Sequence, residues 1–73
     1  MEILIFRTNV NSPKAVKSLF PLLSAELKIL NWTFDLEDCD KILRIEASDK
    51  ISKIIIELLR SSSFECEELF YEL

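Results

Sequence analysis

The apolar residues of this chain change their spacing in a fixed order, and that order restricts the fold more than any other feature of the sequence. Four short stretches have the apolar content or the alternation of β-strands, and two longer stretches repeat apolar residues at helical intervals. They follow one another as strand, helix, strand, strand, helix and strand. A chain of 73 residues is long enough for one core, so we expect a single domain over residues 1–73.

The four predicted strands differ in how they are buried. Glu2–Arg7 is apolar at four successive positions, which indicates a buried central strand. Asn31–Glu37 alternates apolar and polar residues, as a strand with one buried face does. Ile42–Ala47 returns after the polar turn Asp38–Lys41, so these two strands should form a β-hairpin. The last strand is expected over Cys66–Leu73. Three of its residues share one face: Leu69, Tyr71 and Leu73.

Both helices have recognisable starts. Ser12 and Pro13 are typical of a helix N-terminus, because a serine hydroxyl accepts a free backbone N–H and proline suits the first turn. The apolar face of this helix has five members: Val16, Leu19, Phe20, Leu23 and Leu27. Pro21 lies among them and predicts a kink or a new turn, without ending the apolar face. For the second helix we expect Ser48 and Asp49 as the cap and a run of three serines as the end. Its apolar face also has five members: Ile51, Ile54, Ile55, Leu58 and Leu59.

This order predicts an α+β fold, the ferredoxin-like βαββαβ sandwich, in which two helices cover one face of a four-stranded antiparallel sheet. The usual strand order, 4-1-3-2, puts the apolar first strand in the middle. The first loop, the hairpin turn and the loop before the last strand then lie at one end of the sheet. Ser12, Cys39 and Cys66 should therefore share that end.

Composition excludes several classes of function. The net charge of −4 argues against nucleic acid as a partner. Glycine is absent, so no glycine-rich phosphate loop is present. Histidine is also absent, and no nucleophile–base pair can be named, so we expect no enzyme and no catalytic residue. Without a leader-like N-terminus or an apolar run of about 20 residues, we expect a cytoplasmic protein with no membrane contact.

Two stretches, NWTFDLEDCDKILRIEA and KIIIELLRSSSFECEEL, resemble the heavy-metal-associated domain of copper chaperones and metal-pumping ATPases. The family pattern is a strand V-x-V-D-L-E, a hairpin, and a helix that ends I-I-E-x-L-x-x-x-G-[YF]-E. Three segments match it: Phe34-Asp35-Leu36-Glu37, Ile56-Glu57-Leu58 and Ser63-Phe64-Glu65. The similarity extends over essentially the whole chain and implies a metallochaperone-like fold.

The metal motif of that family, M-x-C-x-x-C in the first loop, is missing here. Aligned on this chain, it places Val10 at the methionine and Ser12 and Ala15 at the two cysteines. A serine hydroxyl does not replace the thiolate that soft Cu(I) and Zn(II) prefer. The resemblance therefore implies a family member without the family's metal site, and we expect no cofactor. Phe64, an aromatic in the loop that lies against the metal in the family, is expected to close the end of the core.

Cys39 and Cys66 are the remaining soft ligands. The second and fourth strands lie at opposite edges of the predicted sheet, three steps of about 4.8 Å apart. One ion bound by both cysteines of a single chain is therefore not expected. Each cysteine can be a small apolar filler, or it can contribute to a metal site shared across a dimer.

The exposed surface indicates a binding role. Either Ile3 and Ile5 or Leu4 and Phe6 must point away from the helices, and Ile42 and Phe70 are candidates for the same open face. The leading hypothesis is a stand-alone, non-catalytic protein-interaction or regulatory module, with an unidentified protein or a second copy as its partner; the acidic C-terminal stretch favours a basic partner. One alternative is a copper- or zinc-binding or transport protein that uses Cys39 or Cys66, possibly across a dimer. Another is a small-ligand regulatory domain of the amino-acid-sensing type, which normally has a first-loop glycine that this chain lacks.

Overall fold

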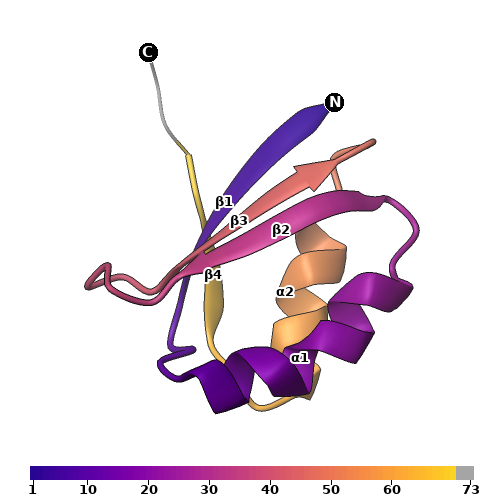
Figure 1. The fold of residues 1–73 in the computed structure, drawn as a ribbon. Helices are drawn as coiled ribbons and strands as arrows, with labels where there is room; N and C mark the ends of the chain where they lie inside the picture. Colours follow the sequence, from indigo (N-terminus) through magenta and orange to yellow (C-terminus); the bar gives the residue numbers. More distant parts are fainter. Residues whose placement is uncertain (71–73) are drawn as a thin grey trace.

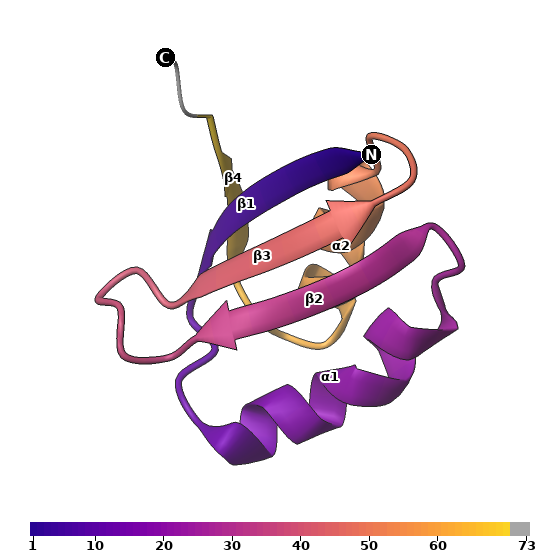
Figure 2. The same ribbon diagram turned by 45° about the horizontal axis from the view of Figure 1, so that its top comes forward.

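Four strands form one antiparallel sheet in the order β2-β3-β1-β4, and both helices lie on the same side of it (Figures 1 and 2). This computed structural model describes residues 1–70. The elements are β1 (Glu2–Thr8), α1 (Pro13–Ala25), β2 (Ile29–Asp35), β3 (Ile42–Ala47), α2 (Ser52–Ser61) and β4 (Cys66–Leu69). The ferredoxin-like α+β prediction is confirmed, including the central position of the first strand.

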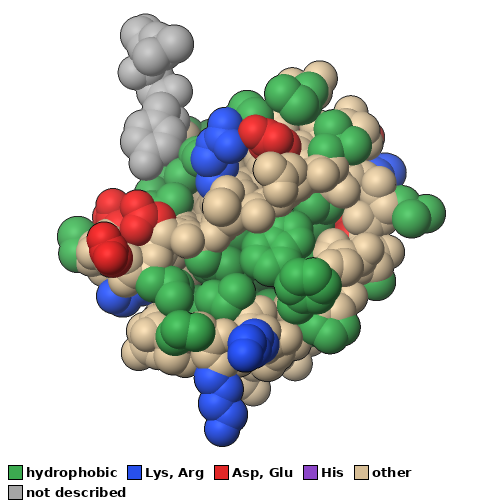
Figure 3. Space-filling view, in the orientation of Figure 1, with side chains coloured by type: hydrophobic (Ala, Val, Ile, Leu, Met, Phe, Trp, Pro, Cys, Tyr) green, Lys and Arg blue, Asp and Glu red, His purple; other side chains and the backbone are tan. Residues whose placement is uncertain are grey.

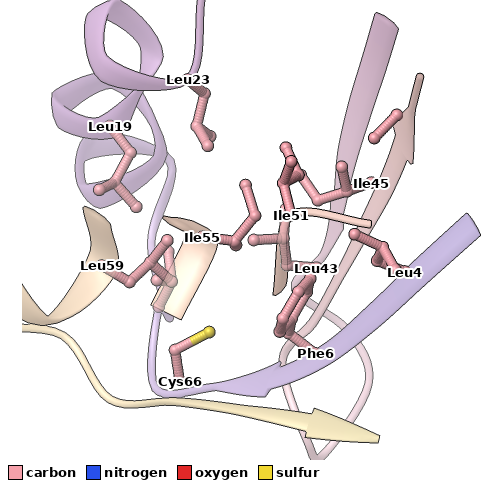
Figure 4. Packing of buried hydrophobic residues seen from close by; sticks show 12 residues of the cluster. Leu4, Phe6, Leu19, Leu23, Leu43, Ile45, Ile51, Ile55, Leu59 and Cys66 are labelled. Carbon is pink, nitrogen blue, oxygen red and sulfur yellow. The ribbon is translucent and has the colours of Figure 1, made fainter. Parts of the chain in front are cut away.

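The centre of the sheet shows why the first strand is apolar at successive positions. Leu4 and Phe6 of β1 point toward the helices and are buried, whereas Ile3 and Ile5 point to the opposite face. Of the two pairs that the sequence left open, Ile3 and Ile5 therefore face outward. The core cluster is drawn in Figure 4, and its members come from both layers: Leu4, Phe6, Val10, Leu19, Leu23, Leu43, Ile45, Ala47, Ile51, Ile55, Leu59 and Cys66.

Helix α1 begins as the sequence predicts. Ser12 is the N-cap, and its Oγ accepts the backbone N–H of Ala15 at 3.2 Å. Pro21 does not end the helix, which continues through it to Ala25. The predicted apolar face is wrong at its end, because Leu27 lies beyond the helix and is 93% exposed. Phe20 is also largely exposed. Fewer side chains of α1 are therefore buried than the helical spacing of its apolar residues predicts.

Helix α2 begins later than predicted. Ile51 is the N-cap and makes no side-chain capping bond, so the expected cap at Ser48 and Asp49 is wrong. Both polar residues are engaged before the helix starts. The Ser48 N–H donates to the Lys28 carbonyl at 2.9 Å, and Asp49 Oδ1 accepts the backbone N–H of Lys50. Burial of Ile51 against the core sets the start of the helix instead.

The bounds of β2 and β4 also differ from the predicted ones. Strand β2 occupies Ile29–Asp35 rather than Asn31–Glu37, because Asp35 Oδ1 accepts the backbone N–H groups of Glu37 and Asp38 and starts the turn. Strand β4 ends at Leu69. The expected positions of Tyr71 and Leu73 lie outside the described residues.

Three loops meet at one end of the sheet, as predicted. The N–H of Thr8 donates to the carbonyl of Asp40, and its hydroxyl donates to the carbonyl of Lys41 at 2.7 Å. Asn9 Oδ1 accepts the N–H of Glu65 at 2.8 Å. The end of β1 thus ties the hairpin turn and the loop before β4 to the first loop. In the part of the chain that is described, no helix is both long and apolar enough to cross a membrane.

Candidate functional site

The first loop, where the resemblance would place a metal, consists of residues with structural roles. Val10 is fully buried, and its N–H donates to the hydroxyl of Thr8 at 3.2 Å. The Ser12 hydroxyl caps α1, and Ala15 is partly buried against the core. None of these side chains offers a soft donor atom. The residues at the three motif positions therefore support the fold here.

Phe64 has the structural role expected from the sequence. It is partly buried and packs against the core cluster, and its N–H donates to the Leu59 carbonyl at 2.9 Å. Ser63 before it has a φ of 68°, a left-handed conformation at the point where the family pattern has glycine. This turn at the end of α2 brings Phe64 back over the core.

The two cysteines have opposite environments. Cys39 is exposed in the hairpin turn, whereas Cys66 is buried at the start of β4. Figure 4 shows the Cys66 sulfur directed into the core cluster. Burial raises the pKa of the Cys66 thiol to about 12; nearby Arg60 lowers it less than burial raises it, and Glu68 raises it further. Cys66 is therefore a protonated core residue at neutral pH.

Cys39 has acidic neighbours on both sides. Within residues 1–70, one group of metal-ligating side chains is close enough to hold an ion: the ligand atoms of Asp38, Cys39 and Asp40 lie within 4.8 Å of one another. The carboxylate of Asp38 is already engaged, since its Oδ1 accepts the N–H of Asp40 at 2.8 Å. Cys66 is not part of this group. The strand order places β2 and β4 at opposite edges of the sheet, as predicted.

The face of the sheet opposite the helices has an apolar centre between two ion pairs. We call it the outer face and define it by Ile3, Ile5, Ile42, Leu69, Arg7, Arg44, Glu46 and Glu67. Ile5 lies beside Leu69 of β4 and beside Arg44 of β3. Arg7 pairs with Glu67, and Arg44 pairs with Glu46, each at 2.8 Å.

Phe70 was a candidate for this face and has a different position. It follows β4, is exposed, and has the Lys50 ammonium 5.8 Å from its ring centre. Lys50 belongs to the segment before α2, so Phe70 lies near the start of that helix.

A second apolar surface was not predicted from the sequence. Phe20 of α1 meets Trp32 of β2 edge-to-face with ring centres 5.5 Å apart, and Trp32 meets Phe34 in the same way at 5.8 Å. We call these three residues the aromatic row. Figure 3 shows apolar side chains gathered between β2 and α1, in the region that these rings occupy. The sequence predicts Phe20 on the buried face of the helix. Helical spacing does not show that Phe20 lies at the margin of that face.

The comparisons with known proteins add no assignment. No family model matches the chain. No curated protein matches it either. The resemblance to heavy-metal-associated domains therefore stays a prediction based on the residues quoted above.

Proposed function

We propose that this chain is a relative of the heavy-metal-associated domain that lacks the family's metal site and acts as a non-catalytic protein-interaction module. The observation that carries the proposal is the outer face. No element in residues 1–70 covers it, and its apolar residues Ile3, Ile5 and Leu69 lie between charged pairs. An apolar centre with a polar rim is the usual anatomy of a protein interface.

The chemistry of the site supports binding over catalysis. The chain has no histidine. The thiol of Cys66 is protonated at neutral pH, because its pKa is raised to about 12, and a protonated thiol is a weak nucleophile. We place this module in the cytoplasm, where cysteines stay reduced, and both cysteines are free in the structure.

Site-specific photo-crosslinking tests the interaction role. A photoreactive amino acid would replace Ile5 on the outer face or Phe20 in the aromatic row, and Lys53 on the exposed side of α2 would serve as the control position. In cells that express the protein, Ile5, Phe20 or both should give discrete adducts with a second protein or a second copy. Lys53 should not. If neither Ile5 nor Phe20 gives more adduct than Lys53, the proposal is wrong.

One observation favours a second candidate, a soft-metal protein. The side chains of Asp38, Cys39 and Asp40 are close enough to contact one ion, and an exposed thiol can complete a site with a second copy. This function requires Zn²⁺ to produce a dimer that Cys39→Ser abolishes and Cys66→Ser leaves intact. Sedimentation with and without Zn²⁺ measures this directly, and a monomer under both conditions rejects the candidate.

A further inference from the structure

The side chains of the outer face lie in rows that run across the strands. Ile3 of β1 lies beside Glu46 of β3, and the next row places Ile5 beside Arg44. Leu69 of β4 extends the second row on the other side of Ile5. Two isoleucines therefore follow one another along β1, and a base and an acid follow one another along β3. Both helices lie on the opposite side of the sheet (Figure 2).

This pattern of side chains is complementary to itself. Two sheets that pack face to face keep their strands nearly aligned. A two-fold axis that crosses the strands between the two rows lays each strand antiparallel over its own copy. Ile3 then faces Ile5 of the second copy, and Glu46 faces Arg44 of the second copy. The symmetry repeats each of these contacts in the reverse direction.

The charged pair on β3 suits such a contact. Within one chain, Arg44 Nη1 and Glu46 Oε1 are 2.8 Å apart. In the two-fold arrangement the pairs of the two copies lie head to tail, so that four charges alternate in sign. Each charge gains a second opposite charge, which offsets the cost of removing it from water.

Other two-fold arrangements of this face bring unlike groups together. Moving the axis by one row places Ile5 opposite Arg7 and Leu69 opposite Glu67. An axis that runs along the strands through the centre of the sheet places Asp35 of β2 against Glu67 of β4. These two acids would repel one another. Of the three arrangements, the axis between the rows alone matches apolar with apolar and acid with base.

We propose that the outer face binds a second copy of this chain, stacked sheet on sheet about this axis. Ile3 packs on Ile5 across the axis, and Glu46 pairs with Arg44. This deepens the interaction function proposed above and rests on it, because it names the partner of the same face. The charges of the two rows balance within the dimer, so the face is not matched to a strongly acidic or strongly basic partner.

The size of the face sets the strength of the dimer. Four strands spaced about 4.8 Å apart, with about 3.4 Å per residue along the seven residues of β1, give an area of about 450 Å² per copy. The two copies together bury about 900 Å², which is below the roughly 1,200 Å² of a stable complex. The dimer is therefore weak and forms at high protein concentration.

Sedimentation equilibrium of the purified protein tests the proposal from about 10 µM to about 1 mM, where weak complexes form. A reductant and EDTA are present, so that neither a Cys39 disulfide nor a metal ion can link two chains. The mass of the wild type should rise from monomer toward dimer. Ile5→Lys places a charge in the contact and should remain a monomer. Phe20→Lys, in the aromatic row on the other side of the sheet, should dimerise as the wild type does.

Charge variants test the axis itself. Arg44→Glu leaves two acids on the β3 rows, and Glu46→Arg leaves two bases. Each variant alone should dimerise at least about tenfold more weakly, because like charges then face one another. An equimolar mixture of the two should form a heterodimer about as tightly as the wild type, since every acid again faces a base. An effect confined to one chain cannot produce this rescue. Lys53→Glu on α2 controls for net charge and should leave the dimer unchanged.

Circular dichroism confirms that each variant is folded before it is sedimented. The proposal is overturned by a wild type that stays monomeric up to about 1 mM, by a dimer that Ile5→Lys leaves intact, or by a mixture that gains nothing over its two components. A monomeric wild type whose Ile5 position crosslinks to a different protein in cells would reject the second copy and leave the interaction function in place.

Discussion

Replacing Ser12 by alanine tests the claim that the first loop supports the fold at the position where the heavy-metal-associated pattern has a metal-binding cysteine. In the structure, Ser12 Oγ accepts the N–H of Ala15 at 3.2 Å, and the Ser12 carbonyl accepts the N–H of Val16 at 3.1 Å. Alanine keeps the second bond and removes the first. Loss of such a cap costs about 1 kcal/mol, within a range of about 0.5–2.

The expected change in melting temperature follows from the size of the domain. For a chain of 73 residues, 1 kcal/mol corresponds to a fall in Tm of about 4–8 °C. Ser12→Asp provides the matched control, because a carboxylate also caps and is favoured by the helix dipole, so it should stay within about 0.5 kcal/mol of the wild type. Ser18→Ala controls for loss of a hydroxyl on the same helix, where Ser18 Oγ donates to the Ala15 carbonyl and does not cap.

Urea denaturation and thermal melting by circular dichroism measure these differences. A Ser12→Ala variant as stable as the wild type would refute the capping role. So would equal losses in Ser12→Ala and Ser18→Ala.

Two further predictions concern the core and the cysteines. Leu19→Ala should cost about 2–5 kcal/mol in urea denaturation because Leu19 is fully buried, whereas Leu22→Ala on the exposed side of the same helix should cost less than about 1 kcal/mol; equal losses would contradict the orientation of α1. In the native state at pH 8, iodoacetamide should modify the exposed Cys39 and spare Cys66, as read by mass spectrometry. The folded state keeps the Cys66 proton up to a pKa of about 12, whereas the unfolded thiol loses it near 9.0, so the contribution of Cys66 should destabilise the fold as the pH rises from 9.0 toward 12. A Cys66→Ala variant should therefore lose less stability than the wild type over this pH range. If the two proteins lose equal stability, the thiol is not buried as described.

The sequence was sufficient for the fold because its local signals agree with one another. The four apolar positions of β1 indicate a central strand, and the structure places β1 between β3 and β4. Ser12 and Pro13 start α1 as predicted, since both the cap and the first-turn proline act locally. Signals that act within a few residues are visible in a single sequence.

The predictions that are wrong concern residues whose side chains contact parts of the chain that are distant in the sequence. Ser48 has the residue type of a helix cap, but both its hydroxyl and its backbone N–H donate to the carbonyl of Lys28, twenty residues earlier. Phe20 has helical spacing with Leu19 and Leu23, yet it lies against Trp32 at the margin of the sheet. The aromatic row was missed for this reason, because it requires the side-by-side position of α1 and β2.

The measurement that tests the central claim most directly is the affinity for Cu(I) and Zn(II) under reducing conditions, by competition with chelators. Wild type is compared with the double variant Cys39→Ser, Cys66→Ser. The variant Val10→Met, Ser12→Cys, Ala15→Cys serves as a control into which the metal motif of heavy-metal-associated domains is introduced. We expect wild type and the double variant to bind equally weakly and the motif variant to gain Cu(I) binding. Tight binding by wild type that the double variant loses would contradict the account and make the protein a metal carrier.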